Sequence, residues 1–545
     1  MKGFCLFLMM IMTSLVYAQK TDFTRQDTLR GSVTKERAWW DLLYYDLDVT
    51  INPKDSTLKG SNTVTYQVLK QRKVMQIDLQ PPMKITSVMQ GKNALKVRKE
   101  GNAHFIELKK KQKPGSVKEL TIYFEGRPQV SKMPPWSGGV TWAKDENGND
   151  FAVTTCQGDG ASLWWPCKDH MYDEPDEGMM ISLTVPGHLT GVANGKLKKT
   201  IDNDDGTKTF RWEVVNPINN YGVNFNVGDY VHFSEKFQGE KGWLDCDYYV
   251  LSYNLDRAKY QFQQVPKMLE AFEYWFGPYP FYEDGYKLVE VPYPGMEHQS
   301  SVTYGNGYEN GYGGRDVSGT GIGMEFDFII IHESGHEWFA NNITYKDIAD
   351  MWVHEGFTAY SESLYLDYNF GKKSAEKYMI GTRQNVRNDR PIIGKYDVNY
   401  AGSSDMYSKA ANMLHTIRQI VNNDTHWRRI LRGLNEEFYH STVTTKEIEK
   451  YINDMIREYD IQPVFDQYLR DTRIPIFAFS FKDNKFWYRW EDCVDDFNMP
   501  VKFSFDRKEY WLEPTTQWQS MDYPANFGKY EVNPNFYVNP MKTVR

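Results

Sequence analysis

Apolar and polar residues alternate along most of the first part of the chain. Between about residues 40 and 235, stretches such as YYDLDVTI and NTVTYQVL have a period of two and are separated by turn-forming clusters such as NPKDST and DNDDGT. A period of two places successive side chains on opposite faces of a strand, so this region is predicted to be an antiparallel β domain. The acidic turn around Gly148 lacks the glutamate that closes a calcium loop, and we interpret it as a hairpin turn.

The pattern then changes to the period of a helix. Apolar residues fall on one helical face from Val265 to Phe276, and Gly277, which a proline follows, is expected to end this helix. A short apolar strand, YKLVEVPY, and an irregular glycine-rich loop come next. Two more helices are predicted over about residues 324–341 and 351–368, the second of them amphipathic.

Alternation returns from Ile474 onward, in IFAFSF, KFWYRW and VKFSF, and predicts a small β domain. The predicted fold class is therefore α+β and multidomain, with an N-terminal antiparallel β domain, a mainly helical central domain and a small C-terminal β domain. The expected division is a signal peptide over residues 1–18, followed by domains over residues 19–240, 241–470 and 471–545.

The first residues, MKGFCLFLMMIMTSLVYAQK, have one positive charge at Lys2, an apolar run from Phe4 to about Val16 and a small residue at Ala18. This arrangement is typical of a cleaved secretory signal. An uncleaved membrane anchor is the alternative, but the apolar run is shorter than the ~20 residues of a spanning helix. We therefore expect an exported protein, periplasmic or secreted, that is not an integral membrane protein after signal cleavage.

Composition narrows the choice of partners. The chain has 545 residues, 41% of them hydrophobic, which is enough for more than one core. Acidic residues outnumber basic ones by 72 to 64, and no block of lysines or arginines interleaves with aromatic residues, so no nucleic-acid partner is expected. The four cysteines after the signal are too few and too scattered for a disulfide framework. The sequence leaves open whether Cys156 and Cys167 pair, and it leaves the oligomeric state unknown.

Two histidines stand four residues apart in a very apolar stretch, IHESGHEWFANN. On a helix, positions i and i+4 are about 40° apart around the axis and ~6 Å apart along it, so His332 and His336 can point their imidazoles at one centre. This spacing suits two ligands of a tetrahedral zinc ion, and Glu333 can reach a metal-bound water without being a ligand. Two hydrogen-bonded core histidines are the alternative, and a third ligand distinguishes the two interpretations.

The third ligand has a candidate in Glu355, which eighteen residues separate from His336. The pattern HESGH, eighteen residues, then a glutamate in EGFTAYSE resembles the gluzincin aminopeptidases, the family of aminopeptidase N and leukotriene hydrolase. The resemblance implies one Zn²⁺ per chain, bound by His332, His336 and Glu355, with Glu333 as the general base. It also implies that residues 241–470 are a thermolysin-like catalytic domain.

Two neighbours of Glu355 need separate consideration. His354 could replace Glu355 as a ligand, but consecutive helix residues point ~100° apart, only one of the two can serve, and the family favours the glutamate. Glu362, roughly on the face of Glu355, is a candidate for orienting a ligand, and the alternative is a solvated helix residue.

A second segment, VPYPGMEHQSSVTYG, is similar to the family's glycine-x-methionine-glutamate-asparagine motif. The resemblance implies that an edge strand with Gly295 and Met296 aligns the peptide and that Glu297 binds its free α-amine, while His298 replaces the asparagine. A carboxylate near the metal pairs with an ammonium group and so selects the end of a chain. The stretch TTCQGDGASLWWPCKDH also resembles a family segment, and on that resemblance Gln157 is assigned to the amine site.

A third segment, YAGSSDMYSKAANML, resembles the family's catalytic-tyrosine segment. The resemblance implies that Tyr407 donates a hydrogen bond to the tetrahedral oxyanion, with Tyr400 as the alternative. Large family members carry a helical C-terminal domain over the active site. Because the roughly 75 residues after Leu469 are predicted to be β, this cap is expected to be absent or replaced by a partner subunit.

The predicted function is that of a zinc-dependent aminopeptidase that acts on peptides with a free N-terminus, by zinc-activated water, a glutamate base and a tyrosine oxyanion donor. Three alternatives remain. A zinc endopeptidase would cleave N-acetylated peptides, which Glu297 disfavours. The second alternative is a hydrolase that acts on an epoxide, because one relative has that activity. The third alternative is a catalytically silent peptide-binding protein. The retained ligands, base and tyrosine disfavour it, because a silent site does not need buried polar groups that cost free energy.

Overall fold

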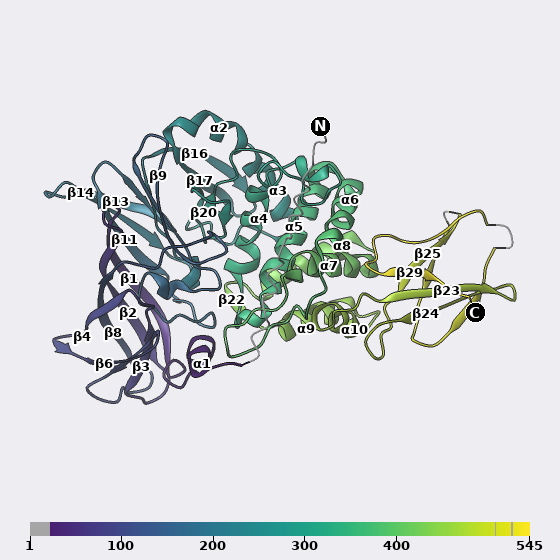
Figure 1. Cartoon of the computed structure of the whole chain (residues 1–545), viewed down its shortest axis with the longest axis horizontal. Coiled ribbons are helices and arrows are strands. Elements are labelled where there is room, and N and C mark those ends of the chain that lie inside the picture. Colours follow the sequence, from purple (N-terminus) through teal and green to yellow (C-terminus); the bar gives the residue numbers. More distant parts are fainter. Residues whose placement is uncertain (1–21, 507, 525–526, 545) are drawn as a thin grey trace, which may run out of the picture.

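The computed structural model describes residues 22–506, 508–524 and 527–544. Figure 1 shows β structure at the N-terminal end (purple and blue), a mainly helical centre (green) and a smaller β region at the C-terminal end (yellow). This arrangement confirms the predicted α+β multidomain fold class. The predicted signal peptide lies outside the described residues, and the domain boundaries stay predictions. None of the helices in the described ranges has the length and apolar character needed to cross a membrane.

An eight-stranded sheet is the framework of the N-terminal β domain. Its strands pair antiparallel, except that β1 and β11 run parallel. Alternate residues of the first strand, such as Leu47 and Val49, are buried, as a period of two requires. In spatial order the strands are β13 (Lys196–Asp202), β14 (Thr207–Val214), β11 (Met179–Pro186), β1 (Trp40–Asn52), β2 (Thr57–Val68), β8 (Val117–Gly126), β4 (Lys84–Gln90) and β5 (Asn93–Ala94).

Smaller sheets complete this domain. The predicted hairpin turn around Gly148 is confirmed, because it joins β9 to β10, and the backbone N–H of Asn149 donates to Asp145 at 2.8 Å. The two sheets are β12 (Thr190–Val192), β15 (Asn226–Gly228), β10 (Asp150–Thr155) and β9 (Gly139–Lys144), and β3 (Val74–Asp78), β7 (Ala103–Glu107) and β6 (Lys96–Glu100). A short helix, α1 (Arg25–Gly31), precedes them. The four cysteines of the described ranges are unpaired.

A five-stranded sheet leads from the β domain into the helical region. Its order is β16 (Tyr230–Gly239), β17 (Gly242–Leu251), β18 (Tyr286–Glu290), β20 (Val302–Tyr304) and β19 (Gly295–Met296). The predicted strand YKLVEVPY is therefore confirmed as β18, and the two-residue strand β19 forms an edge of the sheet. An edge strand has unpaired backbone N–H and C=O groups, so a peptide can be aligned beside it.

Helices form the rest of the central region. The predicted helix over residues 265–276 is confirmed as α3, and it ends at Gly277, whose φ is 97°. The helices are α2 (Leu255–Gln261), α3 (Gln264–Phe276), α4 (Phe328–Gly335), α5 (Trp352–Phe370), α6 (Lys372–Thr382), α7 (Ser408–Val421), α8 (Asp424–Glu437), α9 (Thr445–Ile456) and α10 (Gln462–Phe465), and a short pair of strands is β21 (Ile343–Tyr345) and β22 (Ser441–Val443).

Two helix predictions need correction. The helix expected over about residues 324–341 is regular only from Phe328 to Gly335, and the backbone leaves helical geometry at Phe339 and Ala340. The helix expected over residues 351–368 is present as α5, but it is not amphipathic, because every residue from Trp352 to Leu366 is buried. Tertiary packing on all sides of α5 overrides the two-faced pattern.

The C-terminal β region consists of two small sheets that pack on the helices. Their orders are β27 (Gln519–Asp522), β24 (Lys485–Glu491), β23 (Ile476–Lys482) and β29 (Asn539–Lys542), and β26 (Lys508–Leu512), β25 (Val501–Phe505) and β28 (Tyr530–Val532). His415 of α7 is hydrogen-bonded through Nε2 to Asn535 at 3.0 Å, and both residues are buried. The two regions share one continuous hydrophobic core.

Candidate metal centre and active site

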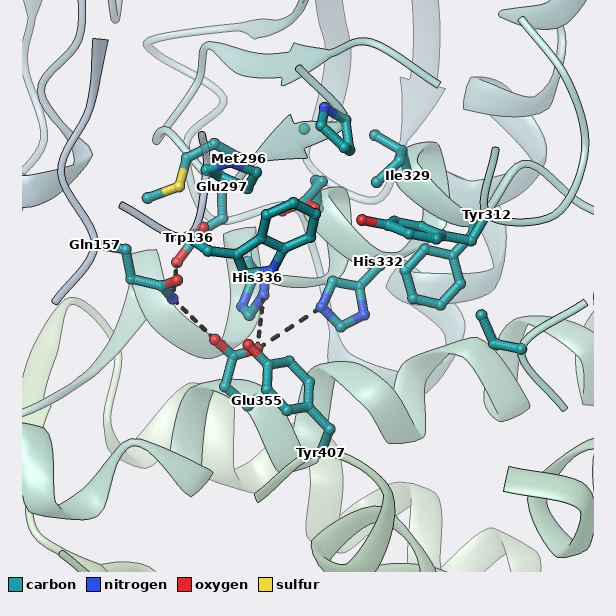
Figure 2. Close-up of a pocket in the computed structure, with 16 residues that line it drawn as sticks. Trp136, Gln157, Met296, Glu297, Tyr312, Ile329, His332, His336, Glu355 and Tyr407 are labelled. Carbon is teal, nitrogen blue, oxygen red and sulfur yellow. Dashed lines mark hydrogen bonds and ion pairs between the residues drawn. The ribbon is translucent and has the colours of Figure 1, made fainter. Parts of the chain in front are cut away.

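Three polar side chains from α4, its C-terminal end and α5 point toward one another (Figure 2). His332 lies in the last turn of α4, His336 follows at its C-terminus, and Glu355 lies in the first turn of α5. Glu355 Oε2 is 3.7 Å from His332 Nε2 and 3.4 Å from His336 Nε2. Atoms bound at 2.0–2.2 Å to one tetrahedral centre are about 3.3–3.6 Å apart, so both distances are close to those between zinc ligands, and the three residues offer ligand atoms within 4.8 Å of one another.

The hydrogen bonds around the histidines leave the facing atoms available. His332 Nδ1 bonds to Glu362 Oε1 at 2.7 Å, and His336 Nδ1 bonds to the carbonyl of Phe339 at 3.0 Å. Each Nε2 is therefore unprotonated and free to bind a cation when Nδ1 donates. Glu355 Oε2 is buried and has no hydrogen-bond partner among the described residues. A buried carboxylate oxygen of this kind is costly unless a cation binds it, so the residues present fit one Zn²⁺.

The break in the helix after α4 orients one histidine of this site. Continued α-helix would direct the carbonyl of Phe339 along the helix axis, whereas the break, with φ 155° at Ala340, lets it accept from His336 Nδ1. Thr358 of α5 also contacts His336 Nδ1, at 3.0 Å. The local departure from helix therefore fixes the orientation of one imidazole.

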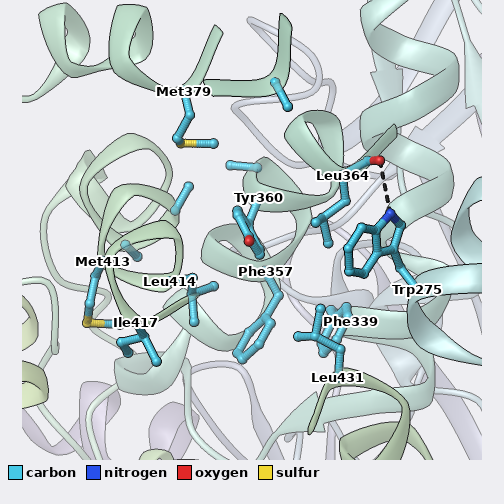
Figure 3. Packing of buried hydrophobic residues seen from close by; sticks show 14 of the residues in the cluster. Trp275, Phe339, Phe357, Tyr360, Leu364, Met379, Met413, Leu414, Ile417 and Leu431 are labelled. Carbon is cyan, nitrogen blue, oxygen red and sulfur yellow. Dashed lines mark hydrogen bonds between the residues drawn. The ribbon is translucent and has the colours of Figure 1, made fainter. Parts of the chain in front are cut away.

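Close packing of α5 against its neighbours sets the position of Glu355. Gly335 of α4 faces Ser361, where an added Cβ would lie 2.5 Å from Oγ, and Gly356 of α5 faces Ala410 of α7, where an added Cβ would lie 2.8 Å from its Cβ. Only glycine permits such close approach of two helices. Figure 3 shows the apolar side chains of α5, among them Phe357 and Leu364, packed between the surrounding helices.

The expected contact of Glu362 with a ligand is confirmed by its bond to His332, and Tyr378 donates to the other oxygen of Glu362. His354 is not a ligand in this structure, because its Nε2 accepts from the backbone N–H of Tyr345 at 2.9 Å. Thr358 was not predicted, although its spacing of about one helical turn from Glu355 could have indicated it, whereas Tyr378 and the Phe339 carbonyl have no local signal.

Glu333 and Glu297 line the cavity in front of the histidines. Oxygen atoms of both carboxylates and a nitrogen of His336 lie within 4.8 Å of one another. Burial raises the pKa of Glu333 to about 7. The cavity has a volume of about 230 Å³, and the described residues that line it include no lysine or arginine. Three buried carboxylates therefore share one cavity that no lysine or arginine of the described residues lines.

The amine-site candidates from two distant parts of the sequence come together. Gln157 Nε2 donates to Glu297 Oε1 at 2.6 Å and to Glu355 Oε1 at 2.8 Å. Gly295 and Met296 form β19, and a Cβ on Gly295 would lie 2.6 Å from Ile329, so a glycine is needed for this strand to approach α4. All four residues line the same cavity.

His298 is not among the residues that line this cavity, and its Nδ1 lies 3.4 Å from Thr303 Oγ1. Its replacement of the family's asparagine therefore changes the support of the strand and not the cavity wall.

Tyr407 lies on the opposite side of the cavity, directly before α7. Its ring is stacked with that of His332 at a centroid distance of 6.1 Å. Burial and the neighbouring Glu355 raise the pKa of the phenol well above its usual value, so the hydroxyl keeps its proton as a donor. Tyr400 does not line the cavity and packs edge-to-face on Phe23 instead.

Comparisons with known proteins agree with this geometry. The chain matches the peptidase M1 N-terminal domain over residues 42–221 and the peptidase family M1 domain over residues 260–468. It is 24% identical to "Endoplasmic reticulum aminopeptidase 1" of Mus musculus over 310 residues, which cover 54% of this chain and 32% of the mouse protein. It is 22% identical to "Aminopeptidase 2" of Candida albicans over 457 residues, which cover 80% of this chain and 47% of the fungal protein.

The chain thus spans about a third to a half of the length of these curated relatives. A solved structure, the M1 zinc metallopeptidase from Deinococcus radiodurans, has the same fold with a TM-score of 0.67 and 19% identity, over 81% of this chain and 95% of that chain. The two family matches together cover most of the chain. The chain therefore belongs to peptidase family M1.

Proposed function

We propose that the protein is a zinc-dependent aminopeptidase, which removes single residues from peptides with a free N-terminus. The names of its relatives support this proposal, because the mouse and Candida proteins are aminopeptidases. A mutant of the Deinococcus metallopeptidase was solved with the bound substrate Tyr-Ser-Ala. A short peptide with a free amino end is the kind of ligand that the present cavity fits.

The distance between Glu297 and the metal-binding group is the observation on which the proposal rests. Carboxylate oxygens of Glu297 and Glu333 lie within 4.8 Å of each other and of a His336 nitrogen. In an amino acid the α-nitrogen and the carbonyl carbon are only about 2.5 Å apart. An ammonium group held at Glu297 therefore leaves room for one residue before the reacting carbonyl, which is the requirement for an exopeptidase.

Charge leads to the same conclusion. Glu297, Glu333 and Glu355 carry three negative charges when ionised, and a zinc ion neutralises two of them. With no lysine or arginine among the described lining residues, one negative charge remains. The α-ammonium of a peptide supplies the missing charge, whereas an internal peptide segment or an acetylated terminus does not.

Each side chain then has one role. Zn²⁺, held by His332, His336 and Glu355, would supply Lewis-acid chemistry toward water and the scissile carbonyl. Glu333 accepts a proton from the attacking water and returns it to the leaving amine. Tyr407 donates a hydrogen bond to the oxygen that becomes negative.

Glu297 and Gln157 hold the free amine. The carboxylate pairs with the ammonium group, and the Gln157 amide nitrogen donates to that carboxylate and also to Glu355, which fixes the position of Glu297. In this arrangement the N-terminus stays in place while the bond one residue away is broken.

A panel of fluorogenic peptides tests the function. Substrates with a free N-terminus are expected to be hydrolysed by the zinc-loaded protein, and the same substrates with an N-acetyl group are not. A chelator is expected to abolish the activity, and added zinc to restore it. Equal rates on free and acetylated substrates would contradict the aminopeptidase proposal and favour an endopeptidase.

We also propose that the protein is exported and acts in the periplasm or outside the cell. The signal-like pattern of the first eighteen residues supports this assignment. Expression in a secreting host followed by N-terminal sequencing of the mature chain is expected to show a start near Gln19. A mature chain that retains Met1 would contradict it.

A further inference from the structure

An exposed tryptophan stands at the entrance of the active-site cavity. Trp136, in the loop between β8 and β9, is 63% exposed and lines the cavity together with Pro135. Within the described ranges it makes no hydrogen bond and no ring contact with another side chain. Single exposed tryptophans are common on protein surfaces, so the position of Trp136 in the lining of the cavity, and not its exposure, indicates a contact with a ligand.

The loop that carries Trp136 is held in one conformation. Ser137 Oγ accepts from the backbone N–H groups of Lys132 and Met133 at 3.0 and 2.8 Å. The N–H of Gly138 donates to Asp159 Oδ2 at 2.6 Å. The loop is thus fastened on one side to itself and on the other to the turn that follows Gln157, so the indole is presented by a firm support.

This anchoring places the indole next to the amine site. Figure 2 shows Trp136 in front of His336, with Glu297, Met296 and Gln157 on one side and Tyr312 on the other. In a bound peptide, the side chain of the first residue leaves the Cα that carries the α-amine, so it starts about 2.5 Å from that nitrogen. The cavity wall beside Glu297 is therefore the wall that meets this side chain.

We propose that Trp136 determines which N-terminal residue the enzyme prefers. Its indole, with Pro135 and Met296, packs on the side chain of the first residue and favours large apolar and aromatic residues such as phenylalanine and leucine over alanine and glycine. This inference rests on the proposed aminopeptidase function, since it assigns a side-chain contact within the same cavity.

A comparison of variants across substrates tests the inference. The ratio of kcat/KM for N-terminal Phe over N-terminal Ala substrates is measured for the zinc-loaded wild type, Trp136→Ala and Trp136→Phe. Loss of an apolar contact of this size is expected to lower the ratio about tenfold in Trp136→Ala, and an aromatic replacement retains most of it. The matched control is Trp243→Ala, because Trp243 is also 63% exposed but does not line the cavity.

A binding measurement without turnover gives a second readout. In a zinc-loaded Glu333→Gln background, calorimetry is expected to show that Trp136→Ala weakens binding of the dipeptide Phe-Ala about tenfold while binding of Ala-Ala changes little. An unchanged ratio, or an equal loss for all substrates and both dipeptides, would overturn the role of Trp136. A wild type that hydrolyses no free-amine substrate would instead overturn the proposed function, so the two failures are distinguishable.

Discussion

Two buried groups of charges in this molecule are built in opposite ways. In the N-terminal β domain, buried carboxylates face cationic side chains of the same fold. These pairs, which we call the N-terminal ion pairs, are Arg37–Asp78, Arg30–Asp169 and Lys168–Asp173. Arg37 Nη2 lies 2.6 Å from Asp78 Oδ2, and Arg37 also donates to the carbonyl of Ser32 at 2.8 Å. Each charge is balanced when folding is complete.

The active-site carboxylates, Glu297, Glu333 and Glu355, have no lysine or arginine partner among the described lining residues, and the side chains near Glu355 that can carry a positive charge are the histidines of the metal site. Glu355 Oε2 accepts no hydrogen bond within the described ranges. The comparison shows that this fold can supply buried cations and does so where stability requires it. In the active-site cavity, which no lysine or arginine of the described residues lines, the balancing positive charge is left to a metal ion and to the ammonium group of a substrate.

The largest expected effect follows from removing one active-site charge that binds no metal. Glu333→Gln keeps the shape of the side chain but cannot accept a proton, so kcat is expected to fall about 10⁴-fold. Steady-state kinetics and zinc content by atomic absorption are measured on the same sample. Zinc content is expected to stay at one ion per chain, and a zinc-loaded variant that keeps a tenth of the activity would contradict the role of Glu333.

Breaking an N-terminal ion pair is expected to affect stability instead. Arg37→Met leaves Asp78 buried without its partner and is expected to lower the free energy of unfolding by about 3–5 kcal/mol. Urea denaturation measures the loss, and the kcat of the folded protein is expected to be unchanged. Arg25→Met is the matched control, because Arg25 pairs with Glu100 at the surface, and its unfolding midpoint is expected not to move.

A smaller effect is expected at the amine site. Glu297→Gln removes the charge that pairs with the α-ammonium, so kcat/KM for free-amine substrates is expected to fall about 100-fold. The rate on N-acetylated substrates, which carry no ammonium group, is expected to stay at its low level. The assignment fails when the variant retains the wild-type preference for free over acetylated substrates.

The smallest effect concerns the support of a metal ligand. Thr358 Oγ1 lies 3.0 Å from His336 Nδ1, and Thr358→Ala removes this contact while the Phe339 carbonyl remains. Zinc affinity is expected to fall about tenfold, measured by competition with a chelator of known affinity. Thr382→Ala, at a buried threonine of α6 away from the ligands, is the control and is expected to leave zinc affinity unchanged. Equal affinities of wild type and Thr358→Ala would remove this residue from the account.

Much of the fold could be predicted from local pattern, because burial follows the period of each element. The strand at Tyr286–Glu290 and the helix that ends before Gly277 are where the pattern places them. Pattern failed where a contact between a side chain and the backbone decides the local geometry. The helix after His336 breaks because the carbonyl of Phe339 turns toward that histidine, and no run of apolar residues encodes such a demand.

Some residues of the site could be predicted from the sequence, and others could not. The spacing of His332 and His336 on one helix follows from helix geometry alone. Glu355 needed the resemblance to a family, because eighteen residues of irregular chain and helix separate it from His336. Trp136 was missed entirely, since a tryptophan in a loop of another domain carries no spacing that connects it to a metal motif.

The central claim is that a divalent cation completes the charge of the active-site carboxylates. Crystals of the zinc-loaded protein, measured at the zinc absorption edge, test it most directly. The predicted result is one anomalous peak about 2.0–2.2 Å from His332 Nε2, His336 Nε2 and a carboxylate oxygen of Glu355. A zinc-loaded crystal with no peak between these three residues, or with its zinc bound elsewhere, would contradict the account.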